Sequence, residues 1–404
     1  MSVMDVLSVF SYILLIPVMG GTVYALLCFG AAAILTRRSQ RQRPPSWPED
    51  AWPGVSLLKP IYGLEKDLAE NLRSACLQNY PGPWQVVLSA QRLDDPALPE
   101  LRRIADAFGP ERVSLVVAEK RPVVNGKLQH LMIAFEAARH PILVISDSDV
   151  RLTPTYLRTV VAPLADPAIG GVCTFYRATR AETWSERLEQ LTLNADFIPN
   201  LIFAEVSGAA DFCLGASTAI RRDVLERIGG FDSLAEYLVE DYEMGRRIRA
   251  IGFEMVILPY FVDMMVDHKH PSDGWRRLVY WDQNTRAARP MGFFATILTR
   301  SIPFAVFFAL SRGFDSLGLI ILASALAARL IAGTLTLSLI GDEASVRNLA
   351  LLPIRDMIGL ASWAAALIKN TFTWRGQSFG LTREGKIIPK NLSEENINIS
   401  SGVP

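Results

Sequence analysis

The feature that most constrains this chain is a long run without charged residues, Val6–Leu35. About 20 consecutive apolar residues are enough for a helix to cross a bilayer. A cleaved signal peptide would have a shorter apolar core with basic residues before it, whereas here the basic residues follow the run, from Arg37 to Arg43. We therefore predict an uncleaved transmembrane helix in residues 1–36, and the positive-inside rule predicts that the chain leaves it into the cytosol.

Further apolar segments follow in the C-terminal third of the chain. Ser316–Ile340 and Leu349–Ile368 each have the length of a span. The second contains Arg355 and Asp356, and because charges are costly in lipid, we expect this pair to face protein, water or the headgroups. Phe293–Leu310 is interrupted by an arginine and a proline, so it either spans or enters as a re-entrant segment. The sequence does not decide on which side of the membrane the C-terminal tail lies. Three C-terminal spans would place the tail outside, whereas the basic residues of the tail favour the inside.

The middle of the chain has the pattern of a soluble α/β domain. It follows a linker, residues 37–53, that is rich in proline and polar residues. Strands are predicted at Val55–Leu58, Gln85–Ser89, Val113–Val117 and Ile142–Ile145, with helices between them at Glu65–Gln78, Ala97–Phe108 and Lys127–Ala138. Apolar strands that alternate with helices predict a parallel sheet covered by helices. Such sheets bind their ligands at the carboxyl ends of the strands.

Composition agrees with a chain that has membrane segments and a soluble part. Half of the residues are hydrophobic, the mean hydropathy is +0.22 and 20% of the residues are charged. Equal numbers of basic and acidic residues, 41 of each, argue against a nucleic-acid-binding protein. The four cysteines are scattered without a CxxC pair, which argues against a disulfide framework and against a zinc site.

Acidic residues stand where strands end. The apolar strand Ile142–Ile145 leads directly into Asp147 and Asp149, and two carboxylates so placed can hold Mg²⁺ or Mn²⁺ while the cation also binds a diphosphate. The alternative is an ordinary solvated turn. Asp94 and Asp95 follow the second strand, where the alternative is a helix N-cap.

A third acidic pair, Glu240 and Asp241, precedes a helical pattern that ends near Gly252. Acidic residues at a helix start are often only partners of the helix dipole. Taken together with the other acidic clusters, however, the pair belongs to an ordered set of short motifs. These are Val55–Pro60, Asn79–Pro81, Asp94–Ala97, Asn125–Lys127, Asp147–Asp149, Glu240–Tyr242 and Trp374–Gly376.

In order and spacing, these motifs resemble those of inverting glycosyltransferases with the nucleotide-diphospho-sugar-binding (glycosyltransferase-A) fold. Within that group the chain is most similar to ceramide glucosyltransferases and their bacterial relatives, which include hopanoid-modifying enzymes, and the resemblance covers nearly the whole chain. It implies that the donor, a UDP-sugar, is bound by Lys59, Pro60, Asp95 and Lys127. It also implies that Asp147 and Asp149 bind the metal and diphosphate, and that Asp241 is the general base for the acceptor hydroxyl.

The chain departs from the family pattern at one motif. The family has a Gln or Arg, two further residues and then Arg-Trp after the base, and here Arg277 and Trp281 match while Tyr280 stands at the Arg position. The resemblance implies that Arg277 and Trp281 help to bind the donor. The positive charge missing at Tyr280 is supplied by Arg276 or Arg286, or else its role is lost. The altered motif also weakens the resemblance to processive polysaccharide synthases.

Two more segments bear on a lipid acceptor. Trp275–Arg289 is a basic amphipathic pattern with tryptophans, which suits a membrane interface, although an ordinary surface helix fits as well. Glu189–Val206 is unusually apolar, so it forms either part of a lipid-acceptor groove or a core helix. His268 and His270 either help to close the donor site or lie in a polar loop.

The predicted organisation is a transmembrane helix (1–36), a linker (37–53), a cytosolic glycosyltransferase domain (54–270), an interfacial amphipathic helix (271–292), C-terminal transmembrane segments (293–370) and a polar tail (371–404). The leading hypothesis is transfer of glucose from a UDP-sugar to a lipid such as ceramide. Transfer of N-acetylglucosamine to a hopanoid polyol is the second. A processive polysaccharide synthase and a non-enzymatic membrane scaffold are the alternatives of other classes.

Overall fold

The computed structural model describes residues 11–41, 46–117, 123–268, 270–369, 371–374, 377–382 and 385–389. Several predicted features therefore fall partly outside the described residues: 6–10 of the first apolar run, Arg43 of the basic segment, Arg375 and Gly376 of the last motif, and the tail beyond residue 389.

The chain forms two compact units, each built from separated segments. The helical unit comprises Met1–Arg41, Ala178–Ala210 and His268–Asn370, and the sheet unit comprises Gln42–Arg177, Asp211–Asp267 and Thr371–Pro404. The predicted 54–270 domain is thus interrupted, because Ala178–Ala210 groups with the apolar helices.

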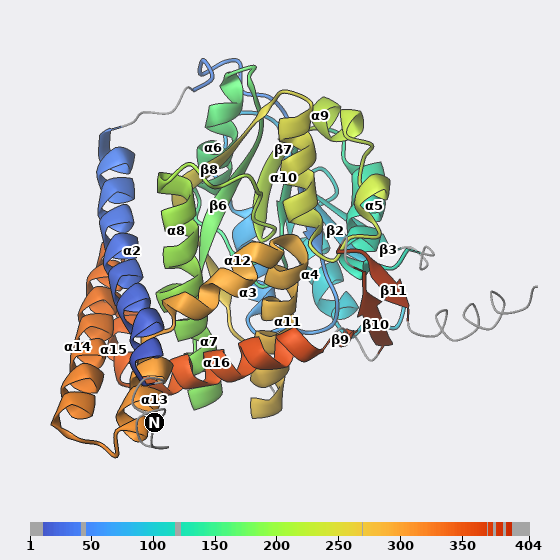
Figure 1. The fold of residues 1–404 in the computed structure, drawn as a ribbon. Helices are drawn as coiled ribbons and strands as arrows, with labels where there is room; N and C mark the ends of the chain where they lie inside the picture. Colours follow the sequence, from blue (N-terminus) through green and yellow to red (C-terminus); the bar gives the residue numbers. More distant parts are fainter. Residues whose placement is uncertain are drawn as a thin grey trace, which may run out of the picture. The chain divides into compact units, whose positions relative to one another are not determined.

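The sheet unit contains an eight-stranded sheet in the order β3-β2-β1-β4-β7-β6-β8-β5 (Figure 1). Its strands are β1 (Val55–Pro60), β2 (Trp84–Ala90), β3 (Val113–Val117), β4 (Ile142–Ser146), β5 (Val150–Arg151), β6 (Ile169–Thr179), β7 (Ser217–Arg221) and β8 (Glu254–Met265). The first four strands of this order, β3, β2, β1 and β4, are parallel, as predicted. Beyond β4 the sheet turns antiparallel, since β7 runs against both β4 and β6. The sheet is therefore mixed.

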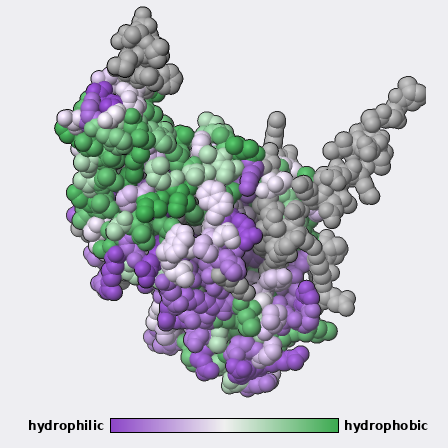
Figure 2. Space-filling model, turned by 90° about the horizontal axis from the view of Figure 1, so that it is seen from below, coloured by the Kyte–Doolittle hydropathy of each residue, from purple (hydrophilic) through white to green (hydrophobic). Residues whose placement is uncertain are grey.

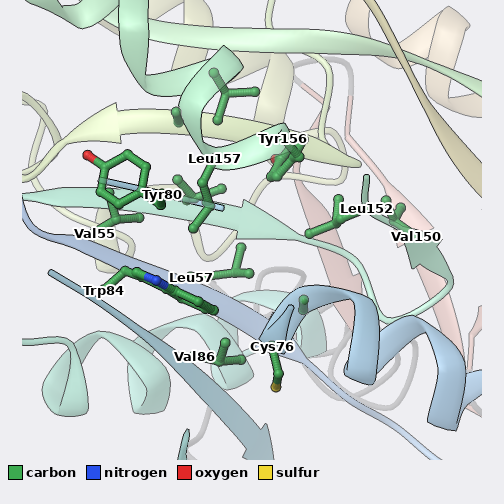
Figure 3. Close-up of a cluster of buried hydrophobic side chains, with 14 of the residues drawn as sticks. Val55, Leu57, Cys76, Tyr80, Trp84, Val86, Val150, Leu152, Tyr156 and Leu157 are labelled. Carbon is green, nitrogen blue, oxygen red and sulfur yellow. The ribbon is translucent and has the colours of Figure 1, made fainter. Parts of the chain in front are cut away.

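Helices connect and cover the parallel strands. They are α3 (Leu68–Cys76), α4 (Leu98–Phe108) and α5 (Gly126–Ala137), followed by α6 (Tyr156–Val161) and the 3₁₀ turn η1 (Ala162–Ala165). Every residue of β1, β2 and β4 is buried, which is typical of parallel strands covered on both faces. Figure 3 shows part of the core, a single cluster to which Val55 and Leu57 of β1, Cys76 of α3 and Tyr156 of α6 all belong. This core holds the strand ends in fixed positions.

The rest of the sheet unit comprises α9 (Arg222–Arg227), η3 (Asp232–Leu234), α10 (Glu240–Ala250) and a small sheet ordered β11-β10-β9. The small sheet is formed by β9 (Thr371–Trp374), β10 (Gln377–Leu381) and β11 (Ile387–Pro389). Part of the predicted polar tail therefore folds onto this unit, where the backbone N–H of Ile387 donates to the carbonyl of Glu236 over 2.8 Å.

The helical unit contains α2 (Leu15–Arg41), α7 (Trp184–Thr192), the π-helical turn η2 (Leu193–Phe197), α8 (Ile198–Val206), α11 (Pro271–Ala288), α12 (Pro290–Ala295), η4 (Thr296–Thr299), α13 (Ser301–Ser311), α14 (Ser316–Leu339), α15 (Glu343–Arg347), η5 (Leu349–Leu351) and α16 (Leu352–Ile368). Among the described residues, three helices are long and apolar enough to cross a membrane: Ser11–Gln40, Ser316–Leu339 and Leu349–Ile368. A fourth candidate, Pro290–Thr299 with Ser301–Ser311, is bent by 51°, at the arginine that interrupts the sequence pattern.

Large apolar side chains remain exposed on these helices. Ile16, Met19 and Val23 of α2 are more than half exposed, and so are Ile320 and Ile331 of α14. The surface view shows hydrophobic side chains gathered together, apart from the hydrophilic ones (Figure 2). Such a surface is suited to lipid rather than to water.

Candidate active site

The acidic turn after β4 lies at the carboxyl end of the parallel strands. Within it, Asp147 Oδ1 is 2.7 Å from Nζ of Lys127, the second residue of α5. From β1, the Lys59 ammonium donates to the backbone carbonyls of Asp147 over 2.7 Å and Val150 over 3.0 Å. Lys59 is fully buried, and burial lowers its pKa to about 8, although Asp149 and Asp147 partly offset the effect. Lys59 thus holds the acidic turn through its backbone.

The loops after β1 and β2 are joined by Asp95. This nearly buried carboxylate accepts hydrogen bonds from the backbone N–H groups of Gly63, at 3.1 and 3.2 Å, and of Ala97, at 2.8 Å. It lies just before α4, whose N-cap is Ala97 rather than an aspartate. Its neighbour Asp94 is exposed and pairs with Arg92. Of the two aspartates, Asp95 is therefore the one that holds the loop after β1 against the loop after β2.

The start of α10 faces the start of α5. Lys127 Nζ donates to the carbonyl of Gly215 over 3.0 Å and lies 3.5 Å from Glu240 Oε1. Burial by itself would lower the pKa of Lys127, but the carboxylates of Asp147 and Glu240 outweigh it and raise the pKa. Asn125 caps α5 and also donates to Glu240 Oε2 over 3.2 Å. Lys127 and Asn125 therefore tie the acidic turn to α10.

Asp241, in the first turn of α10, is half-buried beside Gly215. A Cβ atom at Gly215 would lie 2.7 Å from Asp241 Oδ2, so only glycine allows this approach. Burial, followed by the charge of Glu240, raises the pKa of Asp241 to about 7, while Lys127 lowers it. These groups line one cavity, whose polar wall is Lys127, Gly215, Glu240 and Asp241 and whose apolar wall includes Leu128, Ile145, Phe231 and Met244.

The acidic turn fits a divalent cation that shares its ligands with a diphosphate. Within the described ranges, no group of three or more His, Cys, Asp or Glu side chains could enclose a metal ion. Mg²⁺ is often bound by one or two carboxylates together with substrate phosphates. Asp147 and Asp149 supply two such carboxylates, so the donor set matches a cation completed by a nucleotide diphosphate.

Two of the predicted donor-binding residues, Arg277 and Trp281, belong to the helical unit. Both are on α11, where the Arg277 guanidinium lies 5.3 Å from the centre of the Trp281 ring. Arg277 Nε is 3.2 Å from Glu189 Oε1 of α7, and His268 Nε2 contacts the other oxygen of this carboxylate. His268 lies in the segment between β8 and α11, and its side chain is almost fully buried against this carboxylate.

The structure therefore brings five predicted residues together in the sheet unit: Lys59, Lys127, Asp147, Asp149 and Asp241. Sequence reasoning assigned no role to Asn125, Glu240 or Gly215, which connect them. Two of these residues had a signal in the sequence. An asparagine before Gly-Lys at a helix start, as at Asn125, is typical of an N-cap, and Glu240 stands directly before the predicted base Asp241. Gly215 had no signal, because its importance comes only from the approach of Asp241.

The comparisons with known proteins follow this geometry. The family described as Glycosyl transferase family 21 matches residues 20–387. Ceramide glucosyltransferase 1 of Caenorhabditis elegans is 25% identical over 212 residues, which are 52% of this chain and 45% of the relative. Ceramide glucosyltransferase 3 of the same organism is 21% identical over 351 residues, 84% of this chain and 75% of the relative. The chain thus spans less than half of the first relative's length.

Among solved structures, a mannosyltransferase of Pyrobaculum calidifontis in complex with GDP-Man and Mn²⁺ is similar. It has a TM-score of 0.50 and 21% identity, covering 86% of this chain and 99% of that chain. This likeness shows the fold, which is the glycosyltransferase-A fold predicted from the motifs. With a family match over most of its length and this fold, the chain belongs to glycosyl transferase family 21.

Proposed function

We propose that the chain is a membrane-anchored inverting glycosyltransferase that moves a sugar from a UDP-sugar to the hydroxyl of a lipid such as ceramide, with glucose as the first candidate sugar. The observation that carries the proposal is the shared cavity of Asp241 and Lys127, in which a carboxylate with a pKa of about 7 faces a cation paired with Asp147. The names of the C. elegans relatives support the lipid acceptor and the glucose.

The arrangement suits a single displacement. Asp241 takes the proton from the acceptor hydroxyl as its oxygen bonds to the anomeric carbon. The bond from that carbon to the diphosphate oxygen breaks on the opposite face, so the configuration inverts and UDP leaves. Negative charge grows on the diphosphate during this step, and the Lys127 ammonium is the cation of this chain placed to stabilise it.

Asp147 and Asp149 would hold Mg²⁺ or Mn²⁺, and the bound cation would supply further neutralisation of the diphosphate. The Mn²⁺ and GDP-Man named for the Pyrobaculum mannosyltransferase support a metal and a nucleotide-sugar in this fold. Asp95, Lys59 and Pro60 are proposed to lie on the nucleotide side. We also propose that the catalytic unit faces the cytosol, since basic residues follow the first apolar helix.

A product assay tests the proposal. The purified full-length chain in nanodiscs is given labelled UDP-glucose or UDP-N-acetylglucosamine together with ceramide or a hopanoid polyol and Mn²⁺. We expect labelled glucosylceramide. Transfer of N-acetylglucosamine to the hopanoid would overturn the choice of sugar and acceptor but keep lipid glycosylation. Formation of a polymer, or no binding of UDP by calorimetry, would overturn lipid glycosylation itself.

A further inference from the structure

The entry segment of α10, residues 235–239, lies outside the helices and longer strands of the sheet unit. It connects the end of η3 at Leu234 to the start of α10 at Glu240. Asp241 is in the first turn of α10, so the path of the entry segment decides where its carboxylate lies. Backbone N–H and C=O groups that are buried need hydrogen-bonding partners wherever they are in the chain. The partners of the entry segment therefore bear on the proposed base.

One side of the entry segment is held by Asn125, the N-cap of α5. The Ala235 carbonyl accepts a hydrogen bond from the Asn125 backbone N–H over 3.2 Å, and the Tyr237 carbonyl accepts one from the Asn125 side-chain amide over 3.0 Å. Backbone groups two residues apart in an extended segment point to the same side, as they do in a β-strand. The groups of the residues between them are left for a partner on the other side.

That partner is the C-terminal segment at the start of β11. The Glu236 carbonyl accepts a hydrogen bond from the Ile387 backbone N–H over 2.8 Å, and the Leu238 N–H donates to the Gly385 carbonyl over 3.0 Å. The Ile387 side chain is buried, so this part of the chain is packed into the sheet unit. Terminal segments are usually poorly ordered unless such contacts tie them down. A segment for which the sequence predicted only a polar tail thus holds the entry segment.

The side chain of Lys386 adds to this contact. Lys386 and Tyr237 form an antiparallel bridge, and the Lys386 ammonium lies 3.0 Å from Glu236 Oε2 and 5.6 Å from the centre of the Tyr237 ring. The Arg247 guanidinium of α10 lies 5.5 Å from the centre of the same ring. Lys386 follows Glu236 by 150 residues, so these contacts join the end of the chain to the helix that carries Asp241.

We propose that the tail segment Gly385–Ile387 positions the catalytic base, because it holds the entry segment of α10 from the side opposite Asn125. Without this contact, the Glu236 carbonyl and the Leu238 N–H lose their partners, and the first turn of α10 is free to move. Lys386 and Ile387 act through α10 and are therefore positioning residues. The proposal rests on the proposed function only for the role of Asp241 as the base.

Amide hydrogen exchange tests the contact without sugar transfer, so its result is independent of the proposed function. The full-length chain in nanodiscs is compared with Ile387→Pro, because proline has no N–H to donate to the Glu236 carbonyl. We expect peptides that cover residues 236–243 to exchange about tenfold faster, roughly the factor that one lost hydrogen bond represents. Peptides from β4 should not change. Unchanged exchange in residues 236–243 would overturn the proposal.

Kinetic measurements then show whether the contact acts on catalysis rather than on donor binding. Ile387→Pro should lower kcat by about 10- to 100-fold, since a displacement of 1 Å at a catalytic group can cost the larger factor. Binding of UDP with Mn²⁺, measured by calorimetry, should not change. Ile388→Ala is the control, because Ile388 is the next residue of β11 and its side chain is exposed. Equal kcat values for the two variants would contradict a positioning role.

The pH profile separates movement of Asp241 from a general loss of stability. Burial, followed by the charge of Glu240, raises the pKa of Asp241. If the first turn of α10 loosens, water reaches the carboxylate and its pKa falls, so the acid limb of kcat moves to lower pH. A protein that is only less stable loses active molecules without moving this limb. A reduced kcat with an unmoved acid limb in Ile387→Pro would therefore overturn the proposal.

A charge exchange tests the same contact without a proline. Lys386→Glu brings two carboxylates together and should lower kcat about threefold, a small effect because ion pairs that are partly exposed contribute little. Adding Glu236→Lys restores a pair of opposite charges and should return kcat close to that of the wild type. A double variant that is no more active than Lys386→Glu alone would overturn the role of this pair in holding the entry segment.

Discussion

At the scale of single residues, the chemistry depends on how Asp241 is held. Burial and the neighbouring Glu240 raise its pKa to about 7, whereas Lys127 acts in the opposite direction. A general base works best when its pKa is near the working pH, because it is then both ionised and basic enough to accept a proton. Gly215 contributes by leaving room for the carboxylate. Three neighbours thus decide whether this aspartate is an ordinary acidic residue or a base.

The first prediction concerns pH. Asp241 must be ionised to act as a base, and a raised pKa means that it is protonated below about pH 7. Initial rates of lipid glycosylation should therefore fall about tenfold for each pH unit below that value, as single-proton titration requires. A rate that stays constant from pH 5 to pH 8 would contradict the assignment.

The corresponding variant, Asp241→Asn, cannot take the proton and should lose about 10²–10⁴-fold in kcat, the usual contribution of a general base. UDP binding measured by calorimetry should be retained. Asp223→Asn is the matched control, since Asp223 is an exposed acid in the first turn of another helix, α9. Loss of UDP binding in Asp241→Asn would mean that Asp241 has a structural or donor-binding role instead.

At the scale of elements, the site depends on the beginnings of two helices. The Asn125 side chain accepts hydrogen bonds from the backbone N–H groups of Lys127 and Leu128, as an N-cap does. Its amide also donates to the carbonyl of Tyr237 over 3.0 Å and to Glu240. The Asn125 side chain thus caps the start of α5 and also fixes the start of α10, the helix that carries Glu240 and Asp241.

The second prediction follows from this cap. Asn125→Ala should reduce the free energy of unfolding by about 1 kcal/mol, the usual effect of losing an N-cap. Asn125→Ser keeps a capping oxygen, so its free energy of unfolding should be close to that of the wild type. It has no amide to donate to Glu240, so its kcat should stay as low as that of Asn125→Ala. Thermal unfolding and kcat are measured on both variants. Equal stability of the alanine and serine variants would show that the cap contributes nothing.

At the scale of the whole molecule, each compact unit is assembled from segments far apart in the sequence. In the helical unit, a segment from the middle of the chain, Ala178–Ala210, packs with the terminal apolar helices. A ring of ion pairs between Arg329, Arg355, Asp196 and Asp356 joins this segment to α14 and α16. Arg355 and Asp356 are both buried, so of the three surroundings expected for this pair, which were protein, water and headgroups, the structure shows protein.

The third prediction tests that ring. Arg355→Met leaves two aspartates with a single arginine, and removing one partner of a buried pair typically costs about 3–5 kcal/mol. The double variant Arg355→Met with Asp196→Asn should be less destabilised than the sum of the single variants, because it removes one charge of each sign. A double-mutant cycle of thermal stability in nanodiscs measures this coupling. Strict additivity would mean that the ring does not act as a unit.

Much of the fold was predictable because its signals are local. The parallel strands and their helices were predicted to within a few residues, since apolar runs and helical periodicity are properties of neighbouring residues. The break in the Phe293–Leu310 pattern appears as the bent pair around Arg300. The antiparallel strands β6 and β7 were not predicted, because the direction in which a strand joins a sheet depends on the path of the chain between strands. The same applies to the grouping of residues 178–210.

By itself, the sequence determined the apolar lengths, the strand–helix alternation and the positions of the acidic residues at strand ends. Those features depend on residue type and short-range spacing alone. Only the tertiary structure decided that Lys127 pairs with Asp147, that Gly215 lies against Asp241, and that Arg355 meets Asp196. Each of these contacts joins residues that the chain keeps far apart until it folds. Packing, and not local pattern, therefore selects which charges become neighbours and which pKa values shift.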